Sequence, residues 1–430
     1  MKYKKYPSYK DSGVEWLGDI PSEWLVCRNK TAFQFVKSLV GSESNNYQLL
    51  SLTLNGVIPR DIDSGKGKFP AEFDTYQKVE KNDLVFCLFD IDETPRTIGI
   101  SNYNGMITGA YNVARCTLLA DPKFIYYYYL SIDEYKGLKP FYTGLRKVVR
   151  TETFMNIELA LPQLREQQQI ANFLDNATAK IDTLIEKQTK QIELLKEKRQ
   201  AVISHAVTKG INPKVPMKDS GVEWLGEIPE HWEAKKLKYI STVNDDSLSE
   251  NYSEDFEINY IDIGSVTTGS INKYENMMYS TSPSRARRIV KNGDILVSTV
   301  RTYLKAIAPI SLKEDNFIVS TGFAVVRSKN MIISDFMKYG LLSNYFIDLV
   351  EASSVGISYP AINASDLITF KVAIPPLQEQ REVANYLDDK ISKIDTLIEK
   401  SNKSIELLKE KRTALVSAAV TGKIDVRELV

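Results

Sequence analysis

Residues 181–187 read Ile-Asp-Thr-Leu-Ile-Glu-Lys, and the same seven amino acids return 213 positions later at 394–400. The identity resumes at 192–199, where Ile-Glu-Leu-Leu-Lys-Glu-Lys-Arg returns as 405–412. The wider segments 163–208 and 376–421 align without a gap and agree at 29 of 46 positions. Self-similarity at a fixed offset is the signature of a duplicated structural unit.

Both repeated segments carry apolar residues at alternating spacings of four and three, which is the pattern of a coiled-coil seam. Each segment would reach ~69 Å as one continuous helix. We expect the two helices to pack on each other, antiparallel because a whole domain separates them; the alternative is that each packs on its own globular domain. The predicted seam residues are Leu174, Ile181, Ile185, Ile192 and Leu195 in the first copy, and Leu387, Ile394, Ile398, Ile405 and Leu408 in the second.

A second repeat precedes each half of the chain. Residues 10–18 return unchanged as 218–226, and Trp24 recurs as Trp232. The stretches that follow, about 25–160 and 233–373, resemble each other only in pattern. A chain with repeated helices and two diverged globular parts is expected to have one structural scaffold that carries two different recognition modules.

These repeats predict the organisation of the chain. The first box and globular domain occupy 1–160, and a long helix follows at 161–212. The second box and domain occupy 213–373, and a C-terminal helix with its tail covers 374–430. The predicted fold class is α+β (mixed α/β), with two globular domains joined by two long antiparallel coiled-coil helices in a pseudo-two-fold arrangement.

The composition narrows the possible functions. Fifty-five basic residues balance fifty-five acidic ones, so the basic excess of a typical lone DNA-binding domain is missing. Cys27, Cys87 and Cys116 form no CxxC pair, and the two histidines, His205 and His231, lie far apart. This argues against a disulfide framework, a zinc site and a histidine-based catalytic centre. No apolar run reaches the ~18 residues of a membrane span, so we expect a soluble, cytoplasmic chain.

The order and duplication of these motifs resemble the specificity subunits of type I restriction–modification systems. The resemblance rests on the Gly-Val-Glu-Trp-Leu-Gly-x-Ile-Pro box at 13–21 and 221–229, and on the two long helices. It also rests on the Leu-Pro-x-Leu-x-Glu-Gln helix start at 161–167 and its counterpart at 374–380. Together these features cover nearly the whole chain.

The resemblance implies a DNA-recognition protein without catalytic activity. Each variable stretch would be a target-recognition domain that reads one half of a split site in double-stranded DNA. The helices would set the spacer and dock two methyltransferase (modification) subunits, which carry S-adenosylmethionine and methylate adenine. A separate restriction/translocase subunit would use ATP and Mg²⁺, so this chain itself is expected to bind no cofactor and no metal.

Base edges are read by Arg, Lys, Asn, Gln, Ser or Thr side chains on exposed loops. Arg96 and Arg301 follow equivalent strands, and Gly144 and Gly356 occupy equivalent places beside further candidates. The alternative for each candidate is an ordinary solvated surface residue. The predicted DNA-binding residues are Arg96, Arg146, Lys147 and Arg150 in the first domain, and Arg285, Arg287, Arg288, Arg301, Tyr303, Lys305, Ser358 and Tyr359 in the second.

Two other functions compete with this reading. A coiled-coil adaptor that binds protein partners would share the architecture without DNA specificity. Residues 90–94 read Asp-Ile-Asp-Glu-Thr, which matches the DxDxT signature of haloacid-dehalogenase-type phosphatases, but that fold needs a doubly wound sheet. The equivalent residues 298–301 read Ser-Thr-Val-Arg and contain no carboxylate, so a duplicated reader explains both halves better. Neither a Gly-rich Walker loop nor an Asn/Asp-Pro-Pro-Tyr motif occurs, and no catalytic residue is predicted.

Overall fold

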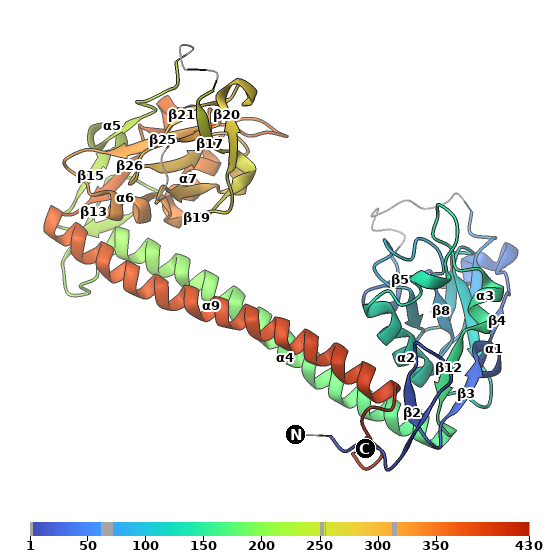
Figure 1. Ribbon diagram of the computed structural model, residues 1–430. Coiled ribbons are helices and arrows are strands. Elements are labelled where there is room, and N and C mark those ends of the chain that lie inside the picture. Colours follow the sequence, from blue (N-terminus) through green and yellow to red (C-terminus); the bar gives the residue numbers. More distant parts are fainter. Residues whose placement is uncertain (1–2, 62–71, 250–252, 254, 312–315, 430) are drawn as a thin grey trace. The chain divides into compact units, whose positions relative to one another are not determined.

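The computed structural model describes residues 3–61, 72–249, 253, 255–311 and 316–429, and the chain divides into two compact units (Figure 1). Unit 1 is Met1–Gln188 with Lys403–Val430, and unit 2 is Thr189–Asn402. Two long helices, α4 (Leu164–Lys209) and α9 (Leu377–Val420), each contribute one end to each unit. The described part of the chain is a mixed α/β protein.

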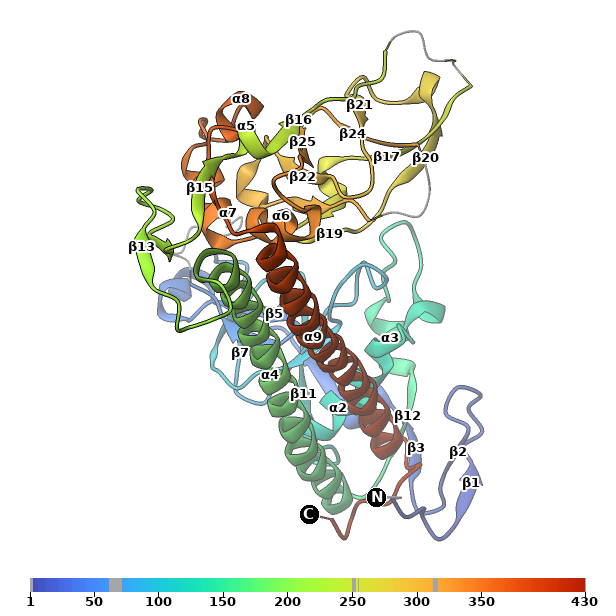
Figure 2. The ribbon, with the colours of Figure 1, turned by 90° about the vertical axis from the view of Figure 1, so that its left-hand side faces the viewer.

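Within each unit α4 and α9 lie side by side and run antiparallel (Figures 1 and 2). In unit 1 the early residue Leu174 of α4 shares a core with the late residue Val416 of α9. In unit 2 the late residue Ile203 of α4 shares a core with the early residue Val383 of α9. The predicted antiparallel pair is thereby confirmed. The same two cores also include residues of the globular parts, so each helix end packs on its own domain as well.

All ten predicted seam residues are buried or half-buried. Two arginines stand at equivalent seam positions, and each forms an ion pair with an aspartate of the other long helix. In unit 2 the Nε of Arg199 lies 3.0 Å from Oδ1 of Asp395, and in unit 1 the Nε of Arg412 lies 2.9 Å from Oδ1 of Asp182. The helix pair therefore carries the same ion pair twice.

Both long helices begin in the same way, and a glycine lies just beyond the end of each. The buried side-chain amide of Gln167 donates to the carbonyl of Pro162 at 2.8 Å, and that of Gln380 donates to Pro375 at 2.9 Å. Helix α4 stops at Lys209, and the following Gly210 has a φ of +76°, a value that favours glycine. The buried glutamine of each helix-start motif therefore has a structural role.

The same four-stranded antiparallel sheet occurs in both units. Its order is β4-β11-β8-β9 in unit 1 and β16-β25-β22-β23 in unit 2. In chain order the strands are β4 (Phe33–Val36), β8 (Leu84–Phe86), β9 (Ile98–Ile100) and β11 (Asn112–Cys116), and then β16 (Ser241–Val243), β22 (Ile295–Ser298), β23 (Ile307–Pro309) and β25 (Phe323–Ser328).

An ion pair with a buried carboxylate joins two central strands of each sheet. Asp83, just before β8, accepts hydrogen bonds from Nε and Nη2 of Arg115 on β11 at 2.9 and 3.0 Å. Asp294, just before β22, accepts from the same atoms of Arg327 on β25 at 2.8 and 2.7 Å. Both carboxylates are almost completely buried. Each carboxylate is held by its arginine and therefore has a structural role.

Two smaller antiparallel ribbons flank each sheet. The box forms a hairpin, β1 (Tyr9–Asp11) with β2 (Asp19–Pro21) and β13 (Met217–Asp219) with β14 (Glu227–Pro229). A second ribbon brings the chain onto the long helices; it is β3 (Leu25–Arg28) with β12 (Glu158–Leu161) and β15 (Glu233–Lys236) with β26 (Lys371–Ile374). Trp24 and Trp232, which follow the box, have no exposed surface.

The units differ in their outer strands. Unit 1 has two separate two-stranded ribbons, whereas unit 2 has a second four-stranded sheet in which β17 and β24 are parallel. These outer strands are β5 (Leu50–Thr53), β6 (Gly56–Pro59), β7 (Gln77–Val79) and β10 (Gly105–Ile107) in unit 1, and β17 (Glu257–Ile261), β20 (Glu275–Met278), β21 (Ala286–Ile289) and β24 (Phe317–Ser320) in unit 2. A further ribbon in unit 2 is β18 (Val266–Thr267) with β19 (Ser270–Ile271).

In each unit one helix of the globular part packs on the beginning of a long helix. In unit 1 this is α2 (Pro122–Glu134), whose Tyr127 hydroxyl donates to Asp175 of α4 at 2.8 Å. In unit 2 it is α6 (Ser334–Leu341), whose Tyr339 hydroxyl donates to Asp388 of α9 at 2.7 Å. The remaining short helices are α1 (Asn29–Ala32), α3 (Thr151–Asn156), α5 (Leu237–Ile240), α7 (Asn344–Ala352) and α8 (Ala364–Leu367).

Candidate nucleic-acid interface

In each unit a short hairpin is bonded to the loop that follows the central strand β8 or β22. We call these the tip hairpins: residues 143–148 in unit 1 and 355–361 in unit 2. In unit 1 the amide of Asp90 donates to the carbonyl of Arg146 at 2.9 Å, and in unit 2 the amide of Ile362 donates to Thr299 at 2.9 Å. Residues from two distant parts of the sequence therefore meet at the same place in both units.

Most candidates of the second domain gather at this place. Arg301 lies over the ring of Tyr359, with 5.1 Å from Cζ to the ring centroid. Lys305 pairs with Glu351 at 3.3 Å, and the side chains of Tyr303 and Ser358 are exposed. The structure thus brings five predicted residues of unit 2 together.

The loop that carries Arg301 has an unusual backbone. Arg301 (φ +51°) and Lys305 (φ +52°) are both left-handed and flank the 3₁₀ turn Thr302–Leu304. In unit 1, Asp90 (φ +48°) and Lys147 (φ +45°) are also left-handed. Non-glycine residues in this region cost of order 1–3 kcal/mol each and cluster at functional sites.

The three arginines near β21 divide into two groups. Arg285 is exposed, and its carbonyl accepts a hydrogen bond from the amide of Thr321. The next residue, Gly322, accepts a hydrogen bond from the amide of Thr299. This ladder connects Arg285 to the loop of Arg301. Arg287 lies instead over the ring of Tyr279 at 5.4 Å, and Arg288 is half-buried within the outer sheet.

The unit 1 candidates lie among carboxylates. Arg146 covers the ring of Phe89 at 5.7 Å and lies 3.5 Å from Asp90. Lys147 pairs with Asp92 at 3.0 Å, and this ion pair is the main reason that the pKa of Asp92 lies below its ordinary value. Lys139 also lies 3.3 Å from Asp92.

Two further unit 1 candidates lie outside the tip hairpin. Arg150 is exposed just before α3. Arg96 pairs with Asp133 at 3.6 Å and Glu134 at 3.5 Å on α2, and only 16% of its side chain is exposed. The sequence equivalence of Arg96 and Arg301 therefore does not extend to their surroundings, because Arg96 is held against α2 whereas Arg301 projects from its loop.

The phosphatase reading does not fit this geometry. Strand β8, which precedes Asp90, pairs antiparallel with both of its neighbours, whereas a doubly wound sheet is mostly parallel. Asp90 and Asp92 are occupied by the cations of the tip hairpin and its neighbourhood. Among the described residues, no group of three or more His, Cys, Asp or Glu side chains is arranged to hold a metal ion.

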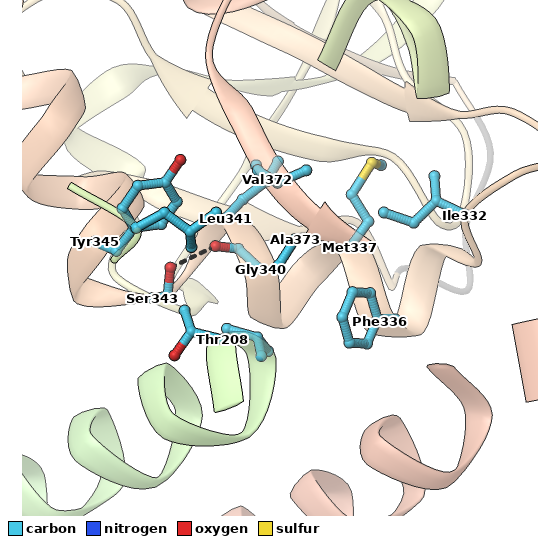
Figure 3. A pocket seen from close by; sticks show the side chains of 12 residues that line it. Thr208, Ile332, Phe336, Met337, Gly340, Leu341, Ser343, Tyr345, Val372 and Ala373 are labelled. Atoms are coloured by element: carbon cyan, nitrogen blue, oxygen red, sulfur yellow. Dashed lines mark hydrogen bonds between the residues drawn. The ribbon is translucent and has the colours of Figure 1, made fainter. Parts of the chain in front are cut away.

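Cavities within the units are small or open to solvent. The cavity of Figure 3 lies in unit 2 between α4 and α6 and has a volume of about 10 Å³. The Oγ of Ser343 donates to the carbonyl of Gly340 at 2.7 Å beside it, and the other walls include Phe336 and Met337. A space of this size holds at most one water molecule. Within the described ranges, no helix is both long and apolar enough to cross a membrane.

The family of the chain follows from its match to a family model described as "Type I restriction modification DNA specificity domain". The model matches twice, at residues 40–194 and 229–407, which together exceed half of the chain. The chain belongs to this family. In this DNA specificity protein the second match contains the complete four-stranded sheet of unit 2, and the first contains all of the unit 1 sheet except β4. Each match also contains the tip hairpin of its unit and part of a long helix.

Relatives of this specificity protein agree with the match. The putative type I restriction enzyme MjaX specificity subunit of Methanocaldococcus jannaschii is 28% identical over 445 aligned residues, which cover 99% of each chain. The MjaVIII specificity subunit of the same organism is 28% identical over 298 residues, or 67% of this chain and 66% of the relative. A solved structure from a study of "complex assembly" and "conformational transition of the type I R-M system" superposes with a TM-score of 0.69 at 14% identity, over 93% of this chain and 98% of the other. That likeness shows a shared fold.

Proposed function

We propose that this chain selects the DNA site of a type I restriction–modification complex, with each globular part reading one half of a bipartite sequence. The observation that carries the proposal is the contrast between the repeated and the diverged parts of the two units. The central sheet and its ion pair recur, whereas the outer strands differ. Two modules on one scaffold with different outer surfaces are suited to two different half-sites.

The proposed contact surface of each unit is its tip hairpin with the adjoining loop. In unit 2 this surface carries Arg301, Tyr303, Lys305, Ser358 and Tyr359, with Arg285 beside it. Arginine can bind guanine through two parallel hydrogen bonds, and serine can bond to several base edges. Arg301 is exposed and has a left-handed backbone, a conformation that clusters at functional sites.

The proposed surface of unit 1 carries Arg146 and Lys147, with Arg150 beyond it. It also carries the carboxylates of Asp90 and Asp92. A carboxylate accepts a hydrogen bond from the amino group of cytosine, so an acidic rim is compatible with base reading. The negative charge of this rim opposes phosphate binding, however, and most non-specific affinity for DNA comes from phosphate contacts.

We infer that partner subunits supply those phosphate contacts and the chemistry. Two methyltransferase subunits would dock on the long helices, which would also set the spacer, and a restriction/translocase subunit would join them. S-adenosylmethionine, ATP and Mg²⁺ would be bound by these partners. The balanced charge of this chain supports the division, because the chain has no excess of basic residues for phosphate binding.

The test is a map of N6-methyladenine across the host genome, made with this gene intact and with it deleted, while expression of the partner methyltransferase is verified in both. Loss of one bipartite motif with a fixed unspecific spacer on deletion is the expected result. An unchanged methylome with the partner expressed would overturn the proposal and favour a protein-binding adaptor. Restoring the gene on a plasmid is the control and should restore the same motif.

A further inference from the structure

Two aliphatic side chains stand fully exposed at equivalent positions of the two units. Leu145 in the tip hairpin of unit 1 and Ile357 in that of unit 2 have no side-chain cover. Each follows a glycine with positive φ, Gly144 at +76° and Gly356 at +123°. A single exposed aliphatic residue is ordinary on a protein surface. Its recurrence at one place in two globular parts whose sequences differ points to a shared role.

The backbone holds each of these side chains outward. In unit 1 the amide of Lys147 donates to the carbonyl of Gly144, and that of Thr143 donates to Val148, both at 3.0 Å. In unit 2 the amide of Val355 donates to Ala361 at 2.9 Å. At Gly356 a Cβ atom would lie 3.1 Å from the carbonyl oxygen of Tyr359, so the turn is closed tightly. The aliphatic group is thus presented on an ordered support, which lowers the entropic cost of inserting it into a partner.

A stacked guanidinium accompanies the aliphatic group in both units. Arg146 directly follows Leu145 and covers Phe89, and Arg301 covers Tyr359, two residues beyond Ile357. Stacking on an aromatic ring orients the planar guanidinium before any ligand is bound. An arginine oriented in this way can bind a base edge beside the point where the aliphatic side chain enters.

The recurrence favours a role that does not depend on base identity. Residues that read bases differ between modules with different targets, whereas a residue that separates base pairs need not differ. Leucine and isoleucine are among the side chains that insert between base steps and unstack them. Methylation of adenine also requires the base to leave the stack, and a step that is already opened lowers the cost of this movement.

We propose that Leu145 and Ile357 are wedge residues: each inserts between neighbouring base pairs of its half-site and unstacks that step, while Arg146 and Arg301 contact the adjoining base edges. The inference rests on the proposed function, because it needs the two globular parts to contact the two halves of a DNA site. It adds a mechanical role for two residues that lack any hydrogen-bonding group in their side chains.

The experiment uses the full chain assembled with its methyltransferase partner and a duplex that carries the motif from the methylome map. 2-Aminopurine replaces single bases across each half-site, since its fluorescence rises when its neighbours unstack. The wild-type complex should show a several-fold rise at one step in each half. Leu145→Ala should abolish the rise in one half only, and Ile357→Ala should abolish it in the other.

Matched variants separate the wedge from a general loss of exposed apolar surface. Leu118 is almost as exposed as Leu145 and lies in unit 1 outside the tip hairpin, so Leu118→Ala should leave both rises unchanged. Met331→Ala serves as the control in unit 2. Leu145→Met and Ile357→Leu, which keep an aliphatic group of similar size, should retain the rise.

Selective binding of the target over a scrambled duplex is measured first. Its absence would overturn the proposed function and the wedge with it. Selective binding without a fluorescence rise that depends on Leu145 or Ile357 would overturn the wedge alone. A loss in Leu145→Ala that appears only when thymine occupies the contacted position would also overturn it, because the side chain would then be reading a thymine methyl group.

Discussion

The Nε of Arg412 lies 2.9 Å from Oδ1 of Asp182, and the equivalent residues of the two long helices, Arg199 and Asp395, make the same contact at 3.0 Å. Both arginines stand where the seam of a coiled coil normally carries an apolar residue. Polar residues at such positions specify the register of a helix pair and reduce its stability. The duplicated ion pair therefore fixes how α4 and α9 align within each unit.

Replacing this arginine with leucine should stabilise the helix pair. Arg412→Leu loses a half-exposed ion pair worth ~0–1 kcal/mol and gains seam burial, so we expect a net gain of about 1 kcal/mol. Urea unfolding followed by circular dichroism would measure it. Lys411→Leu places the same side chain on the exposed neighbouring position and should bring no gain. A loss of stability in Arg412→Leu would show that the ion pair outweighs seam packing.

Removing Arg327 should destabilise unit 2 strongly. The buried carboxylate of Asp294 would lose its hydrogen bonds from the guanidinium and would keep the one from the backbone amide of Lys291. Breaking a buried pair in this way costs about 3 kcal/mol. Thermal unfolding of Arg327→Ala would measure the loss. Lys393→Ala breaks an exposed pair with Asp389 and should cost less than about 1 kcal/mol; equal effects would contradict the structural role of Asp294.

The buried glutamine of the helix-start motif should be essential for stability. Gln380 accepts from the amide of Ile333 at 2.9 Å and donates to Met331 at 3.0 Å and Pro375 at 2.9 Å. Gln380→Leu leaves these backbone groups without that partner, at a cost of about 2 kcal/mol. Gln378→Leu, on the exposed side of the same helix, is the control. An unchanged unfolding midpoint in Gln380→Leu would rule out this role.

Arg301 should affect one half of the DNA site. Arg301→Ala removes an exposed guanidinium and should relax or abolish selectivity at one half, with a loss of roughly ten- to a hundredfold for the correct base. Methylation of a library randomised at both half-sites would measure this. Lys238→Ala removes a lysine stacked on Tyr239 away from the tip hairpin and should leave the motif intact. Equal loss at both halves would reject the assignment.

The cysteines should be unreactive in the folded protein. Burial raises the pKa of the Cys116 thiol from its ordinary value of 9.0 to about 12, and it also raises the pKa values of Cys27 and Cys87. Alkylation requires the thiolate, so iodoacetamide at pH 8 should label none of the three until urea unfolds the chain. The raised pKa values also predict that stability is lost as pH rises from about 9 towards 12, because only the unfolded state then releases these protons freely. Rapid labelling of the native protein would contradict this.

Much of the scaffold could be predicted because its signals are local. The apolar residues of the seam alternate at spacings of four and three, a pattern that is complete within two turns of helix. The end of α4 at Lys209 is indicated by the glycine that follows it. The equivalence of the strands can be recognised in the sequence, because Lys-Asn-Asp-Leu-Val at 81–85 corresponds to Lys-Asn-Gly-Asp-Ile-Leu-Val at 291–297. The differing outer sheets were not visible, since strand pairing between distant segments depends on the whole packed domain.

The surroundings of the candidate DNA-binding residues depended on tertiary structure. The sequence alone determined the duplication, the helix pair and the family resemblance, and it placed Arg96 and Arg301 in equivalent positions. Only the folded chain decided that Arg96 is held by Asp133 and Glu134, whereas Arg301 stacks on Tyr359. Only the folded chain showed that Leu145 is fully exposed. The physical reason is that periodicity belongs to neighbouring residues along the chain, while burial and ion pairing are set by residues that meet only after the chain has folded.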